Sequence, residues 1–189
     1  MRVTVGLVVN PVAARDVRRL TSLARNVDLH ERVNIVARVL RGLAAAGVDD
    51  VLFMAEPCQI VERAWTSLAG ALPSAGRTPS MRPIPAPGPA VDWRGTVAAA
   101  AWLAEARMPC VVTVGGDGTH RAVALGWPDV VFAPFPGGTN NAFAPRVDPT
   151  VVGLAAGLFA RDQLRHAVHA QLAPYLAVDV DGIPHTRAL

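Results

Sequence analysis

The fold is decided by residues 111–119, which read VVTVGGDGT. Apolar and β-branched side chains at the start of this stretch predict a buried strand over residues 110–114. Gly115 to Thr119 then predict a tight turn, and residues 120–125 predict a short helix. A strand that turns directly into a helix is typical of a parallel sheet, because parallel strands need crossover connections.

The remainder of the chain repeats this alternation of strand and helix. Further strands are expected at residues 3–9, 51–55, 129–133 and 175–181. Further helices are expected at residues 15–26, 58–72, 92–107 and 149–166. One more helix is expected to begin at a capping box formed by Asp28 and Glu31 and to end at Gly47. The sequence therefore predicts an α/β fold, with a parallel sheet and helices on both of its faces.

Two stretches depart from the alternation. Residues 73–90 contain six prolines and predict a surface loop, with one short edge strand over 81–84. The pair Asp181-Gly182 follows the last strand and predicts a hairpin turn.

The composition excludes several functions. The chain has 189 residues and 18 basic side chains, all of them arginine, so a P-loop lysine, a Schiff-base lysine and a Ser–Lys pair are absent. A net charge of +3, without basic residues clustered among aromatics, does not favour nucleic-acid binding. No apolar run is long enough to span a membrane. Cys58 and Cys110 are typical of small buried side chains in a reducing compartment, so we expect a cytoplasmic protein.

The first loop, Gly115 to Thr119, carries the strongest chemical signal. Its glycines (Gly115, Gly116 and Gly118) suit a turn with positive φ and the close approach of a phosphate to the backbone. Asp117 is suited to holding Mg²⁺ or to accepting a proton from an attacking hydroxyl, and the Thr119 hydroxyl to bonding a phosphate oxygen. The structural alternative is a βα turn in which Asp117 accepts hydrogen bonds from backbone N–H groups.

Two further loops follow predicted strands and should share the same sheet edge. The second loop contains Gly138, Thr139, Asn140 and Asn141. The side-chain amides of Asn140 and Asn141 suit ribose hydroxyls or base edges, although an Asx turn is an equal alternative for Asn141. The third loop begins at Asn10, a candidate nucleotide contact. It continues to Arg15, Arg18 and Arg19, which suit phosphates or a solvated helix face.

His120 and Phe143 flank these loops. We expect His120 at the surface or in a capping position, and Phe143 in the core rather than stacked on a base.

The motifs resemble those of a known family. GGDGT at 115–119 is similar to the signature of NAD kinases, of diacylglycerol and sphingoid-base kinases and, more distantly, of phosphofructokinases. Together with VVNP at 8–11, GGDGTHRAVA at 115–124 and GGTNNAFA at 137–144, it looks like the ATP-NAD kinase-like proteins of the acetoin-catabolism protein X type.

The resemblance implies a phosphofructokinase-like α/β domain followed by a β-rich domain. It also implies ATP and Mg²⁺ as cofactors, with NAD phosphorylated on the 2′-hydroxyl of its adenosine ribose. Asp117 would take the catalytic and metal-binding role. Nucleotide contacts would come from Asn10, Gly115, Gly116, Gly118, Thr119, Gly138, Thr139, Asn140 and Asn141.

The departures from the family pattern leave alternatives open. The chain has His120-Arg121 where lipid kinases have Asn-Glu, which argues against that branch. We expect an α/β domain at 1–172 and the start of a largely missing β-rich domain at 173–189, which would favour a homo-oligomer. The alternatives to an NAD kinase are a catalytically silent nucleotide-binding regulator and a diacylglycerol or sphingoid-type lipid kinase, and polyphosphate is a second possible donor.

Overall fold

The computed structural model describes residues 2–11, 28–71, 78–85, 92–138, 141–162 and 170–188. Its elements are, in chain order, β1 (Thr4–Val9), α1 (Leu29–Ala45), β2 (Asp50–Phe53), α2 (Ile60–Ala71), β3 (Ser80–Pro83), α3 (Trp93–Glu105), β4 (Val111–Gly115), α4 (Asp117–Gly126), β5 (Phe132–Pro136), α5 (Pro149–Ala160), β6 (Leu176–Val180) and β7 (Ile183–Ala188). The helix predicted at 15–26, with Arg15, Arg18 and Arg19, lies outside the described residues, as do Thr139 and Asn140.

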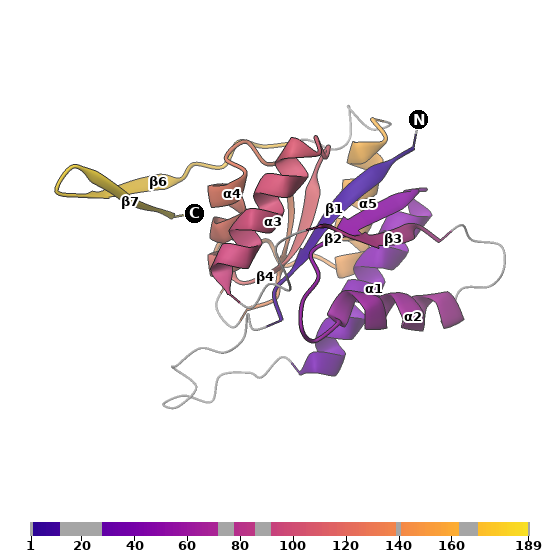
Figure 1. Cartoon of the computed structure of the whole chain (residues 1–189). Helices are drawn as coiled ribbons and strands as arrows, with labels where there is room; N and C mark the ends of the chain where they lie inside the picture. Colours follow the sequence, from indigo (N-terminus) through magenta and orange to yellow (C-terminus); the bar gives the residue numbers. More distant parts are fainter. Residues whose placement is uncertain are drawn as a thin grey trace.

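The first five strands form one parallel sheet in the order β3-β2-β1-β4-β5. Helices cover both of its faces, with α1, α2 and α5 on one side and α3 and α4 on the other (Figure 1). This arrangement confirms the predicted fold class.

The central strand β1 is buried on both faces. Val5, Leu7 and Val9 belong to the core under α1, α2 and α5, whereas Val8 belongs to the core under α3. A strand covered on both sides is apolar at nearly every position, which is why residues 3–9 stand out in the sequence.

Proline closes the outer edge of β5. The Val111 N–H donates to Val131 (3.0 Å) and the Gly137 N–H to Gly115 (2.8 Å), so odd-numbered residues of this strand bond to β4. Pro134 and Pro136 therefore stand where an N–H would point away from the sheet. Since proline has no N–H, the sheet has few donors there for a further strand.

Asp28 and Asp92 are confirmed as helix N-caps, although no capping-box bond between Asp28 and Glu31 is found among the described residues. The Asp28 carboxylate accepts from the N–H of Leu29, and that of Asp92 accepts from the N–H groups of Arg94 (2.8 Å) and Gly95 (3.3 Å). Both caps precede helices whose starts the sequence placed within a few residues.

Three predicted boundaries are wrong. The helix expected from His120 begins earlier, at Asp117, so the second half of the GGDGT motif is the first helical turn rather than a separate turn. Strand β5 begins at Phe132 instead of Asp129. Helix α5 ends at Ala160 instead of His166, because Asp162 adopts a left-handed φ of 58° that ends the helix.

Helices α1 and α5 cross at very close range because glycines line the contact. A Cβ on Gly42 would lie 2.1 Å from the Thr150 carbonyl oxygen, and one on Gly153 would lie 2.1 Å from the Val39 carbonyl oxygen. Only a residue without a side chain fits at these two positions.

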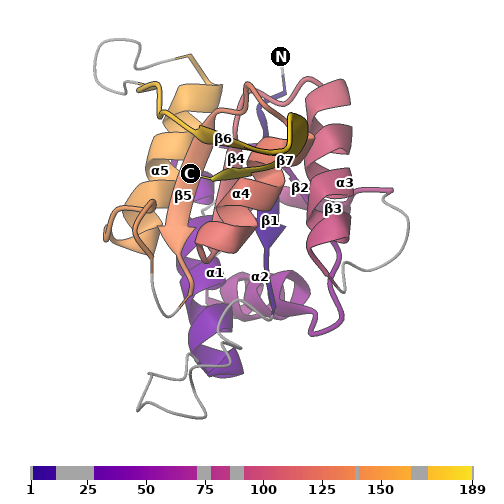
Figure 2. The same cartoon turned by 90° about the vertical axis from the view of Figure 1, so that its left-hand side faces the viewer.

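Strands β6 and β7 form a separate antiparallel hairpin that projects from the α/β body (Figures 1 and 2). Asp181 and Gly182 have φ values of 51° and 76°, as a two-residue hairpin turn with a right-handed twist requires, so the predicted turn is confirmed. Leu176, Val180 and Ile183 are largely exposed. Within the described ranges, no helix is long and apolar enough to cross a membrane.

We expect Gly153→Ala to lower the free energy of unfolding by about 1–3 kcal/mol, because the added methyl group forces α1 and α5 apart. Gly70→Ala is the matched control, because its Cβ meets no atom within 4 Å. Alanine is favoured over glycine in a helix interior by about 0.5–1 kcal/mol, which is the upper limit for Gly70 near the end of α2. Urea unfolding followed by circular dichroism measures both changes. Equal effects of the two substitutions would contradict the close helix contact.

Candidate functional site

The candidate site lies at the carboxyl ends of three adjacent strands. Because β1, β4 and β5 are neighbours in the sheet, the loops that follow them meet at one edge, as predicted. The Asn10 side chain donates to the Thr119 hydroxyl (2.8 Å), and the Gly137 N–H donates to the Gly115 carbonyl (2.8 Å). These bonds join all three loops.

Gly115 is required for space rather than for an unusual backbone angle. A Cβ on Gly115 would lie 2.5 Å from the Thr119 hydroxyl, and a Cβ on Gly137 would lie 3.0 Å from the Gly115 nitrogen. The expectation of positive φ in this loop is wrong, since the described residues show a glycine with positive φ only at Gly47 and Gly182. Thr119 is buried beneath the loop against Gly115 and braces Asn10, so the structure gives these two side chains a supporting role.

Open space lies beside the first turn of α4. Gly116 occupies the N-cap position of this helix in an extended conformation, and no side chain there bonds to the helix N-terminus. The N–H groups of Asp117 and Gly118 have no backbone acceptor among the described residues. A Cβ on Gly118 would meet nothing within 4 Å. An uncapped helix N-terminus with free space beside it suits an anion.

Asp117 connects the first loop to the second. Its carboxylate accepts from the N–H groups of Ala142 (2.8 Å) and Phe143 (3.3 Å), and 33% of its side chain is exposed. The structural alternative for Asp117 is thus present in part, but its backbone partners lie in the other loop instead of its own turn. The carboxylate remains accessible at the helix N-terminus.

The second loop is closed by Asn141. Its amide donates to the Gly138 carbonyl (2.7 Å) and accepts from the Gly138 N–H (3.1 Å). These bonds favour the structural alternative for Asn141 over a nucleotide contact, but they are not the predicted Asx turn. They join Asn141 to a residue three positions earlier, whereas the N–H two positions ahead, that of Phe143, donates to Asp117. The neighbouring candidates Thr139 and Asn140 lie outside the described residues.

His120 is the residue that the sequence misplaced most. Its ring is fully buried under the first loop instead of at the surface, packed between Phe132 and Phe143. Burial lowers the pKa of His120 below its ordinary value of 6.5. The Thr113 carbonyl and the Asp117 carboxylate act in the opposite direction. In the sequence, His120 directly follows a polar glycine-rich loop, and nothing in that local pattern indicates that its side chain is buried.

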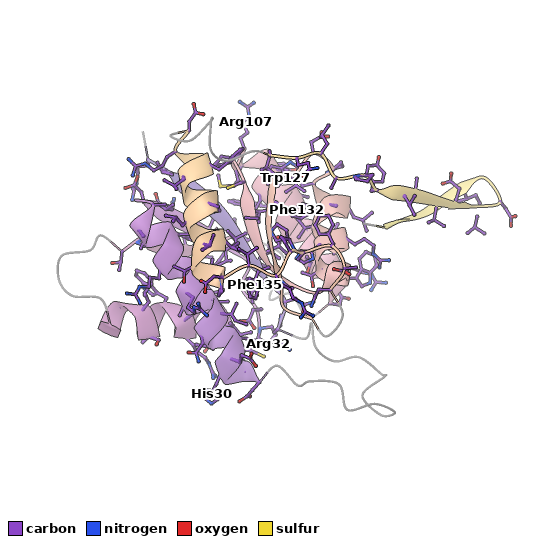
Figure 3. The ribbon with its side chains drawn as sticks, turned by 180° about the vertical axis from the view of Figure 1, so that it is seen from behind. His30, Arg32, Arg107, Trp127, Phe132 and Phe135 are labelled. Carbon is purple, nitrogen blue, oxygen red and sulfur yellow. The ribbon has the colours of Figure 1, made fainter. Side chains whose placement is uncertain are left out.

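Other polar residues at the same edge were not singled out in the sequence. Arg32, labelled in Figure 3, lies in the first turn of α1 and is buried. It donates to the carbonyl of Pro11, the residue after Asn10. Glu56 follows β2 and caps α2 through the N–H groups of Cys58 (2.6 Å) and Ile60. Burial raises the pKa of Glu56, and the hydrogen bonds lower it. Burial is what distinguishes these two charged residues from others in the sequence.

Cys110 is not a candidate nucleophile. Burial raises the pKa of Cys110 to about 12, and its thiol faces the Ala156 carbonyl. The described part of the chain also holds no group of three or more histidine, cysteine, aspartate or glutamate side chains placed to bind a metal. A magnesium ion here would take phosphate oxygens and water as its remaining ligands, as Mg²⁺ commonly does.

Comparison with known proteins agrees with this geometry. The diacylglycerol kinase catalytic domain matches residues 61–171. The acetoin catabolism protein X of Cupriavidus necator is 37% identical over 170 residues, which cover 85% of this chain. The chain spans 44% of the length of that relative. No solved structure is significantly similar to this chain.

We expect acidification to destabilise the protein through His120. A buried histidine with a lowered pKa binds fewer protons in the folded state than in the unfolded state, so its contribution is complete above pH 6.5 and is lost as the pH falls. The slope for one group reaches at most about 1.4 kcal/mol per pH unit. Urea unfolding at pH 7.5 and 5.5 should therefore show a larger loss of stability in the wild type than in His120→Leu. Parallel losses would contradict this assignment.

Proposed function

This chain belongs to the family of diacylglycerol kinase catalytic domains, and on that premise we propose that it is an ATP- and Mg²⁺-dependent phosphotransferase that phosphorylates NAD. The acceptor is the 2′-hydroxyl of the adenosine ribose, and the product is NADP.

One observation carries the proposal. The Asp117 carboxylate lies, partly exposed, at the uncapped N-terminus of α4, beside the open space at Gly118. Backbone N–H groups and the positive end of the helix suit phosphate oxygens, which matters in a chain without lysine. A carboxylate in the same turn suits a divalent cation or a reacting hydroxyl.

Each of these residues has a separate role in the proposed reaction. The N–H groups of Asp117 and Gly118 hold the phosphate chain of ATP, and Asp117 orients the acceptor hydroxyl and withdraws its proton. When bound at Asp117, Mg²⁺ supplies neutralisation of charge on the phosphate oxygens. Asn10 and Thr119 keep α4 fixed on the strand end, so that these groups are in place before the substrate binds.

NAD as the acceptor rests on the resemblance of the loop motifs. The family match supports a second candidate, a lipid kinase acting on a diacylglycerol, although His120-Arg121 replaces the Asn-Glu pair expected of that branch. A nucleotide-binding regulator without turnover is the third.

We expect Asp117→Asn to lower the rate of NADP formation about 100-fold or more, because the amide neither withdraws a proton nor holds Mg²⁺ well. The assay follows NADP with Mg·ATP as donor, and repeats with polyphosphate as donor and with diacylglycerol as acceptor identify the true pair. Unfolding midpoints control for the lost bonds to Ala142 and Phe143. Equal NADP formation by the wild type and Asp117→Asn would refute the catalytic role. If the protein binds ATP but phosphorylates no acceptor, the nucleotide-binding regulator is the candidate function that remains.

We expect Gly118→Ala to separate binding from folding. Its methyl group enters open space, so the protein should be at least as stable as the wild type, since alanine favours a helix. The same methyl group would occupy the space proposed for phosphate, so the Kd for ATP should rise about 10-fold or more. Calorimetric titration with Mg·ATP measures this change, and Gly70→Ala serves as the control. Unchanged affinity would place the phosphate elsewhere.

A further inference from the structure

Three aromatic rings from different elements meet behind the Asp117 carboxylate. The His120 ring of α4 lies 6.3 Å from that of Phe132 in β5 and 5.6 Å from that of Phe143 in the second loop, and the two phenylalanine rings are 5.8 Å apart. Phe132 lies along β5 in Figure 3. Phe143 is thus held by its side chain in this cluster and by its N–H on Asp117.

A histidine at the centre of this cluster has a cost that an apolar side chain would avoid. The His120 ring is 0% exposed, and among the described residues neither ring nitrogen has a partner at hydrogen-bonding distance and angle. The Thr113 carbonyl of β4 is near enough to favour the protonated ring, but it makes no hydrogen bond of good geometry with it. A buried polar group without a partner destabilises a protein by about 1–3 kcal/mol. Such a group calls for a specific explanation.

The imidazole points toward the proposed catalytic carboxylate. His120 follows Asp117 by three positions on the same helix, and its Nδ1 lies 3.9 Å from Asp117 Oδ1. A hydrogen bond needs this distance to shorten by about 1 Å. That oxygen is at present turned toward the Phe143 N–H.

We propose that His120 is a positioning residue for Asp117. Its imidazole bonds to the Asp117 carboxylate when the backbone N–H groups of the second loop no longer do. Entry of a substrate beside Asp117 displaces the N–H groups of Ala142 and Phe143. The Nδ1–H of the neutral imidazole then donates to Oδ1 and keeps the carboxylate directed at the acceptor hydroxyl. This inference rests on the proposed phosphotransferase function for its kinetic consequence, but not for its geometry.

The kinetic test compares variants that differ in their donor. His120→Leu retains apolar packing and removes the donor, so kcat should fall about 10-fold or more while KM for ATP changes less than about 2-fold. Its unfolding midpoint should equal or exceed that of the wild type. His120→Asn places an N–H near the position of Nδ1 and should recover part of kcat. Phe132→Leu is the matched control, because it alters the same cluster without touching Asp117, and it should keep kcat.

Wild-type kcat in His120→Leu would overturn the proposal and leave His120 a packing residue. An equal loss of kcat in Phe132→Leu would also overturn it, because the cluster as a whole would then be responsible.

A second readout does not need turnover. Proton–nitrogen correlation spectra of the histidine rings show which nitrogen carries the proton, and Mg·ADP serves as the probe. We expect His120 of the loaded wild type to be the Nδ1–H tautomer with a strongly shifted proton, and this signature to be lost in Asp117→Ala. An Nε2–H tautomer that is the same in both proteins would overturn the inference. If the wild type shows the signature, Asp117→Ala loses it, and yet the wild type phosphorylates no acceptor, the result would refute the proposed function and leave this inference standing.

Discussion

The candidate site depends on the contact between Thr119 and the bare Cα of Gly115. Since a Cβ at Gly115 would lie 2.5 Å from the Thr119 hydroxyl, any other residue would move α4 away from the end of β4. The short distance allows the helix to begin at Asp117, two residues after the strand ends. It also brings the Thr119 hydroxyl within 2.8 Å of the Asn10 amide, which fixes β1 to the same helix. A single missing side chain therefore sets the geometry of this sheet edge.

Asp117 combines two roles that compete for the same oxygen atoms. An acidic side chain in the first turn stabilises a helix, and here the carboxylate also holds the backbone of Ala142 and Phe143. Both bonds stabilise the free protein, and both must be exchanged if a cation or substrate is to use the carboxylate fully. In our proposal, the buried imidazole of His120, whose Nδ1 lies 3.9 Å from Asp117 Oδ1, replaces the lost backbone donors and keeps the carboxylate oriented during that exchange.

The absence of lysine shapes the electrostatics of this edge. Positive potential here comes from the N-terminus of α4 and from backbone N–H groups, which are fixed in place by the fold and lose no side-chain entropy on binding. Arg32 is the buried cation nearby, and it is oriented by the Pro11 carbonyl. Family membership is compatible with such a backbone-based phosphate site. In the proposed function, the Asp117 carboxylate and a cation bound there would supply the remaining charge.

The sequence alone determined the strand and helix pattern, the sheet type, the caps at Asp28 and Asp92, and the loops that meet at one edge. These features depend on local periodicity and on the rules of parallel sheets. Only the tertiary structure decided that α4 begins at Asp117, that its carboxylate bonds to the second loop, and that His120 is buried. Each of these depends on atoms far apart in the chain coming within a few ångströms, and packing between elements, which no local pattern encodes, sets those distances.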